Sequence, residues 1–75
     1  MPYISIKAYP KDDETKRKTV EAILEVIQKT MGAEPDWVTV SVEDIEPDDW
    51  EEKVVKAEIL PKMDHVLILD GKKRY

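Results

Sequence analysis

Position 2 holds the residue of this chain whose type and place could do chemistry. If Met1 is removed, Pro2 becomes the N-terminus, and its nitrogen is then a secondary amine rather than an amide. An unperturbed α-amino group has a pKa of about 7.7–8.0, and burial in an apolar pocket lowers that pKa because burial disfavours the charged form. A base of this kind suits proton abstraction from a carbon next to a carbonyl. The proline ring also fixes φ, so the base would be held in place.

The sequence offers little other catalytic or metal-binding machinery. It has no cysteine and a single histidine, His65, so we predict no metal site. A nucleotide-binding loop and a serine or cysteine triad are also missing. Because proline makes up about 5% of residues in proteins, Pro2 by itself is weak evidence for an enzyme. Its surroundings in the chain must supply the rest of the argument.

Charge and hydropathy exclude several classes of partner. Lysine and arginine number 12 against 17 aspartates and glutamates, which gives a net charge of −5. An acidic chain does not attract phosphate backbones through its long-range field, so we expect no nucleic acid partner. The longest apolar run, residues 66–69, is far shorter than the roughly 20 residues that span a bilayer. With no signal-peptide pattern at the start, we expect no membrane partner and a cytoplasmic location.

The length of 75 residues predicts a single domain over residues 1–75. A chain this short buries only about 60–65% of the surface that its unfolded form exposes. No disulfide can compensate for the small core, because the chain has no cysteine. Self-association, which buries apolar surface between subunits, is the simplest remaining support.

Two segments in which apolar and polar residues alternate, with a helix between them, must position Pro2. Residues 3–9 alternate between apolar and polar side chains and predict a strand that ends at Pro10. Residues 14–31 predict a helix, with Asp12 or Asp13 as its N-cap and Gly32 as its C-cap. One face of this helix is an apolar stripe of Val20, Ile23, Leu24, Ile27 and Met31.

A second alternating segment, residues 37–45, predicts a second strand. A strand, a helix and a strand at these spacings form a β-α-β unit with parallel strands and a right-handed crossover. The helix can cover one face of such a sheet. The other face would carry Tyr3, Tyr9 and Trp37 together with Trp50, and a second subunit is the obvious cover for it.

The C-terminal part predicts smaller elements. A short second helix opens at Pro47 and is limited by Pro61, with Trp50, Val54 and Ala57 on one face. Residues 63–69 include a short strand, and Asp70-Gly71 is a turn signal. The predicted fold class is therefore α/β (α+β): a β-α-β unit with a short second helix and a short C-terminal strand.

The order of these features resembles the 4-oxalocrotonate tautomerase family over about residues 2–50. Its most specific element is a proline that follows Met1 directly and opens the first strand. The segment 46–50 and the longer C-terminal part are more similar to the phenylpyruvate enol–keto tautomerase branch. The motifs that carry the likeness are Met1-Pro2-Tyr3-Ile4-Ser5-Ile6-Lys7, Met31-Gly32-Ala33 and Trp37-Val38-Thr39-Val40-Ser41-Val42-Glu43-Asp44-Ile45.

The resemblance implies an oligomeric sandwich of β-α-β subunits in which Pro2 is the catalytic base. Such enzymes move a proton between two positions of an enol or a 2-oxo acid, and they need no cofactor. A homodimer is the assembly that the branch implies, with a hexamer as the alternative. Trp50 falls where the family has an aromatic residue lining the pocket; the alternative role for Trp50 is packing of the second helix.

The sequence departs from the family pattern at two arginines. Lys11 stands in the first of these regions and Thr39 at the second position, and by the resemblance both are candidate substrate-binding residues. A lysine attracts a carboxylate but cannot clamp it with two parallel hydrogen bonds. We therefore expect a monocarboxylate with an apolar or aromatic body, such as phenylpyruvate. Lys11, with backbone N–H groups, would hold its carboxylate or enolate oxygen; otherwise Lys11 is a solvated loop lysine.

Two other functions remain open at this point. The chain could catalyse another proline-based reaction on a 2-oxo acid, such as a decarboxylation or dehalogenation, although the additional charged groups for these are not evident. It could also be a non-catalytic oligomerising module on the same scaffold. The changes at Lys11 and Thr39 favour the module, whereas the proline after Met1 favours an enzyme.

Overall fold

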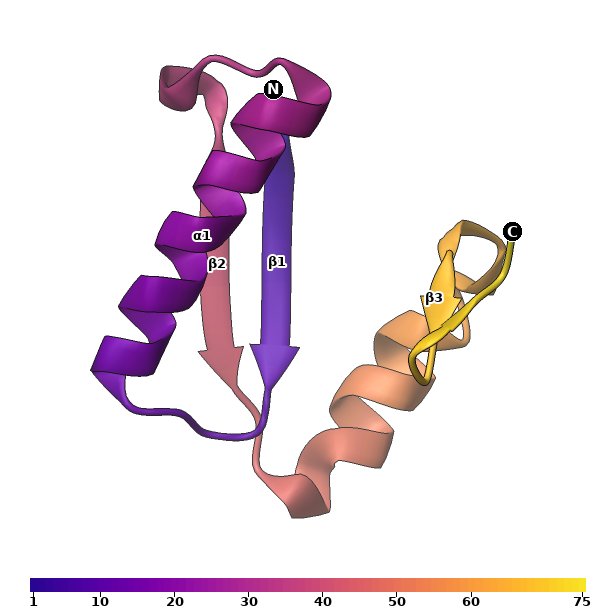
Figure 1. Cartoon of the computed structure of the whole chain (residues 1–75). Coiled ribbons are helices and arrows are strands. Elements are labelled where there is room, and N and C mark those ends of the chain that lie inside the picture. Colours follow the sequence, from indigo (N-terminus) through magenta and orange to yellow (C-terminus); the bar gives the residue numbers. More distant parts are fainter. The chain divides into compact units, whose positions relative to one another are not determined.

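The structure is a computed structural model that describes all residues, 1–75. The chain forms two compact units, Met1–Ile45 and Glu46–Tyr75 (Figure 1). Each unit is described by itself below. That they make up one domain stays a prediction.

The first unit is a β-α-β unit. Strand β1 (Tyr3–Ala8) is followed by helix α1 (Asp13–Met31) and strand β2 (Thr39–Asp44). The two strands pair in parallel, with Tyr3 opposite Thr39 and Ala8 opposite Asp44. The predicted fold class is confirmed, although both strands are shorter than the alternating segments that predicted them.

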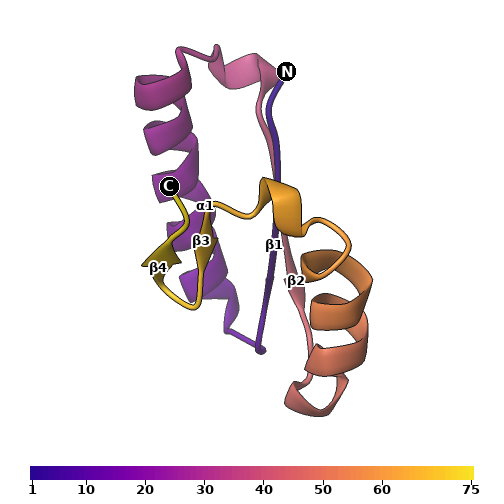
Figure 2. The ribbon, with the colours of Figure 1, turned by 90° about the vertical axis from the view of Figure 1, so that its right-hand side faces the viewer.

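The two faces of this sheet differ in chemistry. Paired residues of parallel strands share a face, so Ile4 and Ile6 lie with Val40 and Val42. Helix α1 lies across one face of the β1–β2 sheet (Figure 2), and its stripe from Val20 to Ile27 is half-buried. The opposite face carries a different set of side chains: Tyr3, Ser5, Lys7, Thr39, Ser41 and Glu43.

Both predicted caps of α1 are confirmed. The Asp12 carboxylate accepts a hydrogen bond from the backbone N–H of Thr15 at 2.9 Å. This bond satisfies one of the amides that the first helical turn leaves unpaired. At the other end, Gly32 adopts a left-handed φ of 67°, and its N–H donates to the carbonyl of Gln28. Glycine tolerates this conformation because it has no Cβ.

Replacement of the N-cap is expected to destabilise the protein in a pH-dependent way. The hydrogen bond from Thr15 holds the pKa of Asp12 below its ordinary value of 3.8. A lowered pKa stabilises the folded state above that ordinary value, and the contribution is lost as the pH falls through the folded-state pKa. Asp12→Ala should therefore lower the thermal midpoint by a few degrees at pH 7, and by less at pH 2.5. Asp13→Ala, which removes a neighbouring charge but no cap, is the control; equal losses in both variants would contradict this role.

In the second unit, the predicted short strand and the predicted Asp70-Gly71 turn are confirmed. A helical segment is followed by a hairpin of β3 (Ile68–Leu69) and β4 (Lys72–Lys73). Its turn places Asp70 at φ 51° and Gly71 at φ 79°, the left-handed pair that a two-residue hairpin loop requires. The sequence indicates β3 and the turn, and the structure adds β4 as the strand that pairs with β3. In the structure the Arg74 N–H donates to the Leu67 carbonyl at 2.8 Å and continues the pairing.

The helical segment of this unit differs from the expectation in its winding. A turn of 3₁₀ helix, η2 (Pro47–Asp49), leads into a π-helix, η3 (Glu51–Ile59), and a second 3₁₀ turn, η4 (Met63–His65), follows. The i→i+5 bonding of η3 continues to Leu60, whose N–H donates to the Val55 carbonyl. Val54 is buried, but Ala57, which was expected on the same face, is exposed. The wider turn of a π-helix rotates Ala57 off the face that α-helical spacing predicts.

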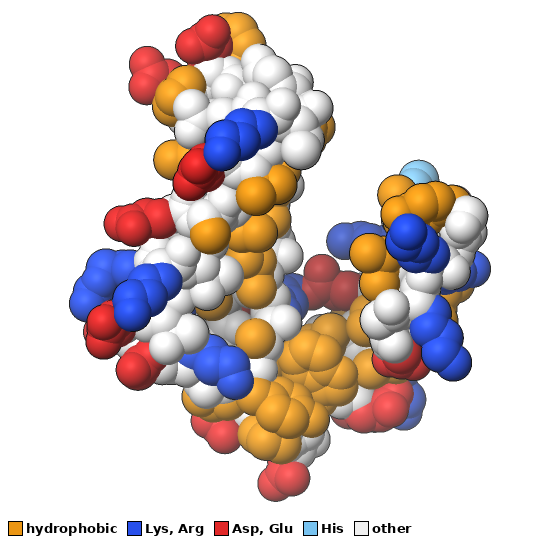
Figure 3. All heavy atoms as spheres, viewed as in Figure 1, with side chains coloured by type: hydrophobic (Ala, Val, Ile, Leu, Met, Phe, Trp, Pro, Cys, Tyr) orange, Lys and Arg blue, Asp and Glu red, His pale blue; other side chains and the backbone are white.

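The chain buries few of its apolar side chains. Only Ile45 and Val54 are buried, at 4% and 6% exposure. Apolar side chains reach the surface among the charged ones (Figure 3). The large exposed side chains are Met1, Tyr3, Tyr9, Val26, Met31, Trp37, Leu60, Leu67, Ile68 and Tyr75. None of the helices combines the length and the apolar character needed to cross a membrane.

Candidate active site

Pro2 lies at the start of the sheet, directly before β1. Its carbonyl accepts a hydrogen bond from the backbone N–H of Thr39 at 3.1 Å, which extends the pairing of β1 with β2 by one step. The backbone of Pro2 is thereby held against the first residue of β2. Two of the predicted site residues, Pro2 and Thr39, are thus neighbours in space although 37 positions separate them in the sequence.

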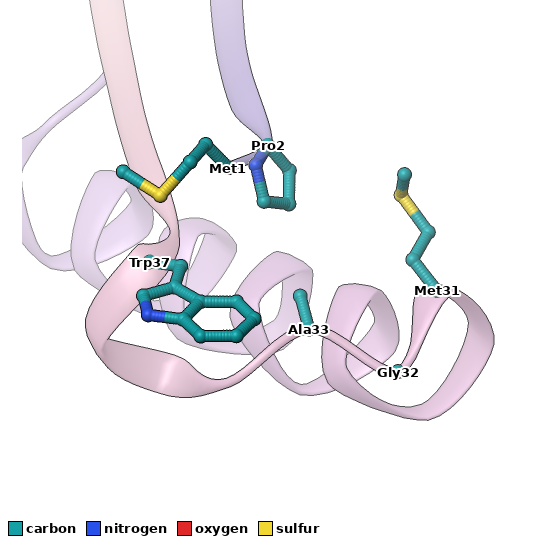
Figure 4. A pocket seen from close by; sticks show the side chains of 6 residues that line it. All are labelled: Met1, Pro2, Met31, Gly32, Ala33 and Trp37. Atoms are coloured by element: carbon teal, nitrogen blue, oxygen red, sulfur yellow. The ribbon is translucent and has the colours of Figure 1, made fainter.

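A pocket of about 280 Å³ opens at Pro2. Its walls come from the N-terminus, from the end of α1 with the loop after it, and from the turn before β2 (Figure 4). None of its side chains is charged, so its polar groups are backbone atoms and the indole N–H. The residues that line it are Met1, Pro2, Met31, Gly32, Ala33 and Trp37.

The local sequence explains how Trp37 reaches this pocket. Pro35 opens a single 3₁₀ turn, η1 (Pro35–Trp37), at the position where its fixed φ suits a helix start. The N–H of Trp37 donates to the Glu34 carbonyl at 3.0 Å, and the N–H of Val38 donates to the Pro35 carbonyl at 3.2 Å. The expectation that Trp37 begins the second strand is therefore wrong. The turn takes Trp37 out of the alternation and directs its indole into the pocket (Figure 4).

Met1 bears on the site in two ways. As long as it is present, the nitrogen of Pro2 is an amide, which cannot act as a base. The Met1 side chain also lines the pocket, although it is 93% exposed. Removal of Met1 would thus convert the Pro2 nitrogen into an amine and widen the pocket in the same step.

The structure does not bring Lys11 to Pro2 within one chain. The two residues lie beyond opposite ends of β1, whose six residues span about 20 Å at roughly 3.3 Å each. Lys11 instead contacts the end of β2, where its N–H donates to the Asp44 carboxylate at 3.4 Å. The same carboxylate pairs with the Lys16 ammonium at 2.9 Å, and these contacts, chiefly the one from Lys16, lower the pKa of Asp44.

The fourth predicted site residue, Trp50, belongs to the second unit. It is half-buried and directly precedes η3. Its role as a pocket wall stays a prediction.

Sequence reasoning missed the parts of this pocket that tertiary structure assembles. Met31 was expected to pack with the apolar stripe of α1, but it is 65% exposed and lines the pocket. Trp37 was placed on a strand. One signal was available for each residue: Gly32 ends the helix beside Met31, and Pro35 marks a turn before Trp37.

The structure contains no group of three or more histidine, cysteine, aspartate or glutamate side chains that could hold a metal ion. The lining of the pocket at Pro2 includes none of these four residue types.

A parallel β-α-β unit that opens at Pro2 beside such a pocket agrees with the family resemblance in the sequence. The family model described as "Tautomerase enzyme" matches residues 2–56, which is more than half of the chain. The protein belongs to the tautomerase family. This membership supports an isomerase or tautomerase activity, a small substrate and oligomer formation.

Several curated relatives are similar over most of the chain. "Tautomerase PptA" of Enterobacter sp. (strain 638) is 33% identical over 73 residues, which cover 95% of this chain and 96% of that protein. "Tautomerase PptA" of Pectobacterium carotovorum subsp. carotovorum (strain PC1) is 32% identical over 66 residues, 85% of this chain and 87% of that protein. The Klebsiella pneumoniae (strain 342) protein of the same name is 32% identical over 73 residues, with coverage of 95% and 96%.

Proposed function

We propose that this protein interconverts the enol and keto forms of a 2-oxo acid, with the nitrogen of Pro2 as the general base once Met1 is removed. The observation that carries the proposal is the pocket at Pro2, which no charged side chain lines. Without a neighbouring negative charge, nothing in the pocket stabilises the protonated amine. A neutral amine near pH 7 is the form that can take a proton.

The proton transfer needs only the amine and hydrogen-bond donors. In the keto-to-enol direction, the Pro2 nitrogen takes a proton from the carbon next to the carbonyl. The electrons of that C–H bond form the new carbon–carbon double bond, and the carbonyl electrons move onto oxygen. The protonated amine then gives its proton to this oxygen, which forms the enol and restores the neutral amine. In the reverse direction the amine takes the O–H proton of the enol and delivers it to carbon. Backbone N–H groups and Lys11 are the donors that we assign to the developing oxygen charge.

The residues near Pro2 favour a substrate with one carboxylate. Thr39 adjoins Pro2 through the 3.1 Å backbone hydrogen bond, and its side chain is neutral. A threonine hydroxyl can donate one hydrogen bond to a carboxylate but cannot balance its charge. We therefore assign a phenylpyruvate-like monocarboxylate as the substrate, with Trp50 as an additional apolar wall.

A second copy of the chain is needed if Lys11 is to reach the substrate. Lys11 lies about 20 Å from Pro2 along β1 by strand geometry, so the lysine at any one pocket would come from another subunit. The small number of buried side chains and the exposed Tyr3 also favour self-association. We propose a homodimer, with a hexamer as the alternative assembly.

The direct test is ketonisation of enol-phenylpyruvate by the Met1-free protein, followed by ultraviolet absorbance. We expect turnover well above the rate in buffer, in proportion to protein concentration. A rate equal to that in buffer would overturn the proposal. The non-catalytic module, which the neutral side chain of Thr39 favours, would then be the better account.

A further inference from the structure

We propose that Trp37 is the residue that selects the body of the substrate, and that it favours an aromatic 2-oxo acid over a short aliphatic one. This inference rests on the proposed function of Pro2 and adds to it a residue that determines specificity in the same pocket. Neither the family match nor the relatives' names assign a role to Trp37.

The position of Trp37 makes it the largest wall of the pocket. Its indole and the ring of Pro2 come from different segments, and Ala33 leaves the space beside them open (Figure 4). Trp37 is 51% exposed and lines the pocket, so part of its indole surface is open to a ligand. A tryptophan face exposed in a pocket is unfavourable in water and gains from contact with another aromatic ring.

The far wall is suited to the same occupant. Met31 is 65% exposed and lines the pocket from the end of α1. A thioether is flexible and polarisable, and it makes favourable contacts with aromatic rings. Trp37 and Met31 thus offer apolar surface from two different segments. A flat ring would contact more of that surface than a methyl or ethyl group.

The size and charge of the pocket set how such a substrate lies. Its volume of about 280 Å³ includes Met1 as a wall, so the Met1-free protein has more room. With Met1 present, the volume of the pocket is just below that of the smallest small-molecule sites, which begin at about 300 Å³. Because no charged side chain lines the pocket, the carboxylate would point to the opening and the apolar body inward.

The first experiment compares two substrates in the Met1-free protein. Exchange of the C3 protons in deuterated water, followed by NMR, reports proton abstraction for both phenylpyruvate and 2-oxobutyrate. We expect Trp37→Ala to lower kcat/KM for phenylpyruvate about tenfold or more, and for 2-oxobutyrate less than about threefold, because only the larger body loses contacts. Trp37→Phe, which keeps an aromatic wall, should restore most of the selectivity. An unchanged ratio between the two substrates in Trp37→Ala would overturn the proposal while leaving the role of Pro2 intact.

The second experiment measures binding without catalysis. The chain has two tryptophans, so Trp50→Phe leaves Trp37 as the only indole fluorophore, and Trp37→Phe leaves Trp50 alone for comparison. Both substitutions are made in the Met1-free Pro2→Ala protein, and each protein is titrated with 3-phenylpropanoate and with butyrate. We expect 3-phenylpropanoate, but not butyrate, to quench the fluorescence of Trp37 in a saturable way. Quenching of Trp50 alone, or no quenching at all, would overturn the proposal. If Trp37 is quenched but the Met1-free protein with Pro2 shows no proton exchange, the role of Trp37 in binding is retained and Pro2 is not the base.

Discussion

Replacing Pro2 by alanine in the Met1-free protein is expected to lower the ketonisation rate of enol-phenylpyruvate by about 100-fold. Alanine keeps an N-terminal amine, so the chemical group survives. It loses the ring that fixes φ and limits the positions of the nitrogen. Misplacement of a reacting group by about 1 Å can cost about 10²-fold in rate. The change should appear mainly in kcat, because the substrate-binding walls of the pocket are unaltered.

Blocking the same nitrogen should have a larger effect. A protein that keeps an uncleaved N-terminal extension has an amide at Pro2 and no base at all. We expect its rate to fall by about 10²–10⁴-fold, the usual contribution of a general base. Mass spectrometry of each preparation establishes which form is present before the rates are compared.

A proline outside the pocket supplies the control for both changes. Pro61 is exposed in the second unit, and Pro61→Ala should keep the parent rate. Full activity in the extended protein would show that the base lies elsewhere. Full activity in Pro2→Ala alone would show that an N-terminal amine suffices without the proline ring.

The second large effect concerns assembly. Because only two side chains are buried in the single chain, we expect the stability of the protein to depend on its concentration. For a dimer whose subunits do not fold alone, each tenfold dilution should lower the apparent free energy of unfolding by about 1.4 kcal/mol. Chemical denaturation at several protein concentrations measures this slope, and analytical ultracentrifugation distinguishes a dimer from a hexamer.

A charge placed on the open sheet face should abolish that assembly. Ser41 is opposite Ser5 on the face that α1 does not cover, and its hydroxyl lies 3.4 Å from that of Tyr3. Ser41→Arg would bury an unpaired charge if a second copy packs there, which is strongly unfavourable. Val26→Arg, on an exposed position of α1, is the matched control and should assemble normally. A Ser41→Arg protein with the parent mass would place the interface on another surface.

The open sheet face also bears on how the pocket is completed. Tyr3 and Thr39 both lie on that face. Tyr3 follows Pro2 in the sequence, and the backbone N–H of Thr39 donates to the Pro2 carbonyl. A second copy packed against it would therefore lie close to the pocket. If dissociation by Ser41→Arg also removes activity, the pocket depends on the neighbouring subunit.

The sequence alone determined those features of the structure that depend on residues close together in the chain. Alternation over a few residues predicted β1 and β2, and the apolar stripe with its caps at Asp12 and Gly32 predicted α1. The Asp70-Gly71 turn was likewise predicted correctly. Each of these depends on backbone geometry and on side chains within one or two turns, which the sequence displays directly.

The role of Pro2 could be predicted from the sequence only in part. Its place after Met1 and before a strand was evident from the sequence, as was the resemblance to the tautomerase family that the match over residues 2–56 bears out. The pocket beside it was not, because its walls come from three segments that only the packed β-α-β unit brings together.

Tertiary structure decided the rest. Trp37 lies in the turn that begins at Pro35, and not in the expected strand, so it lines the pocket. Met31, at the end of α1, lines the same pocket. The parallel pairing put Lys11 and Pro2 beyond opposite ends of one strand while it joined Pro2 to Thr39. These relations depend on where the chain returns after a 19-residue helix, and no local pattern encodes that distance.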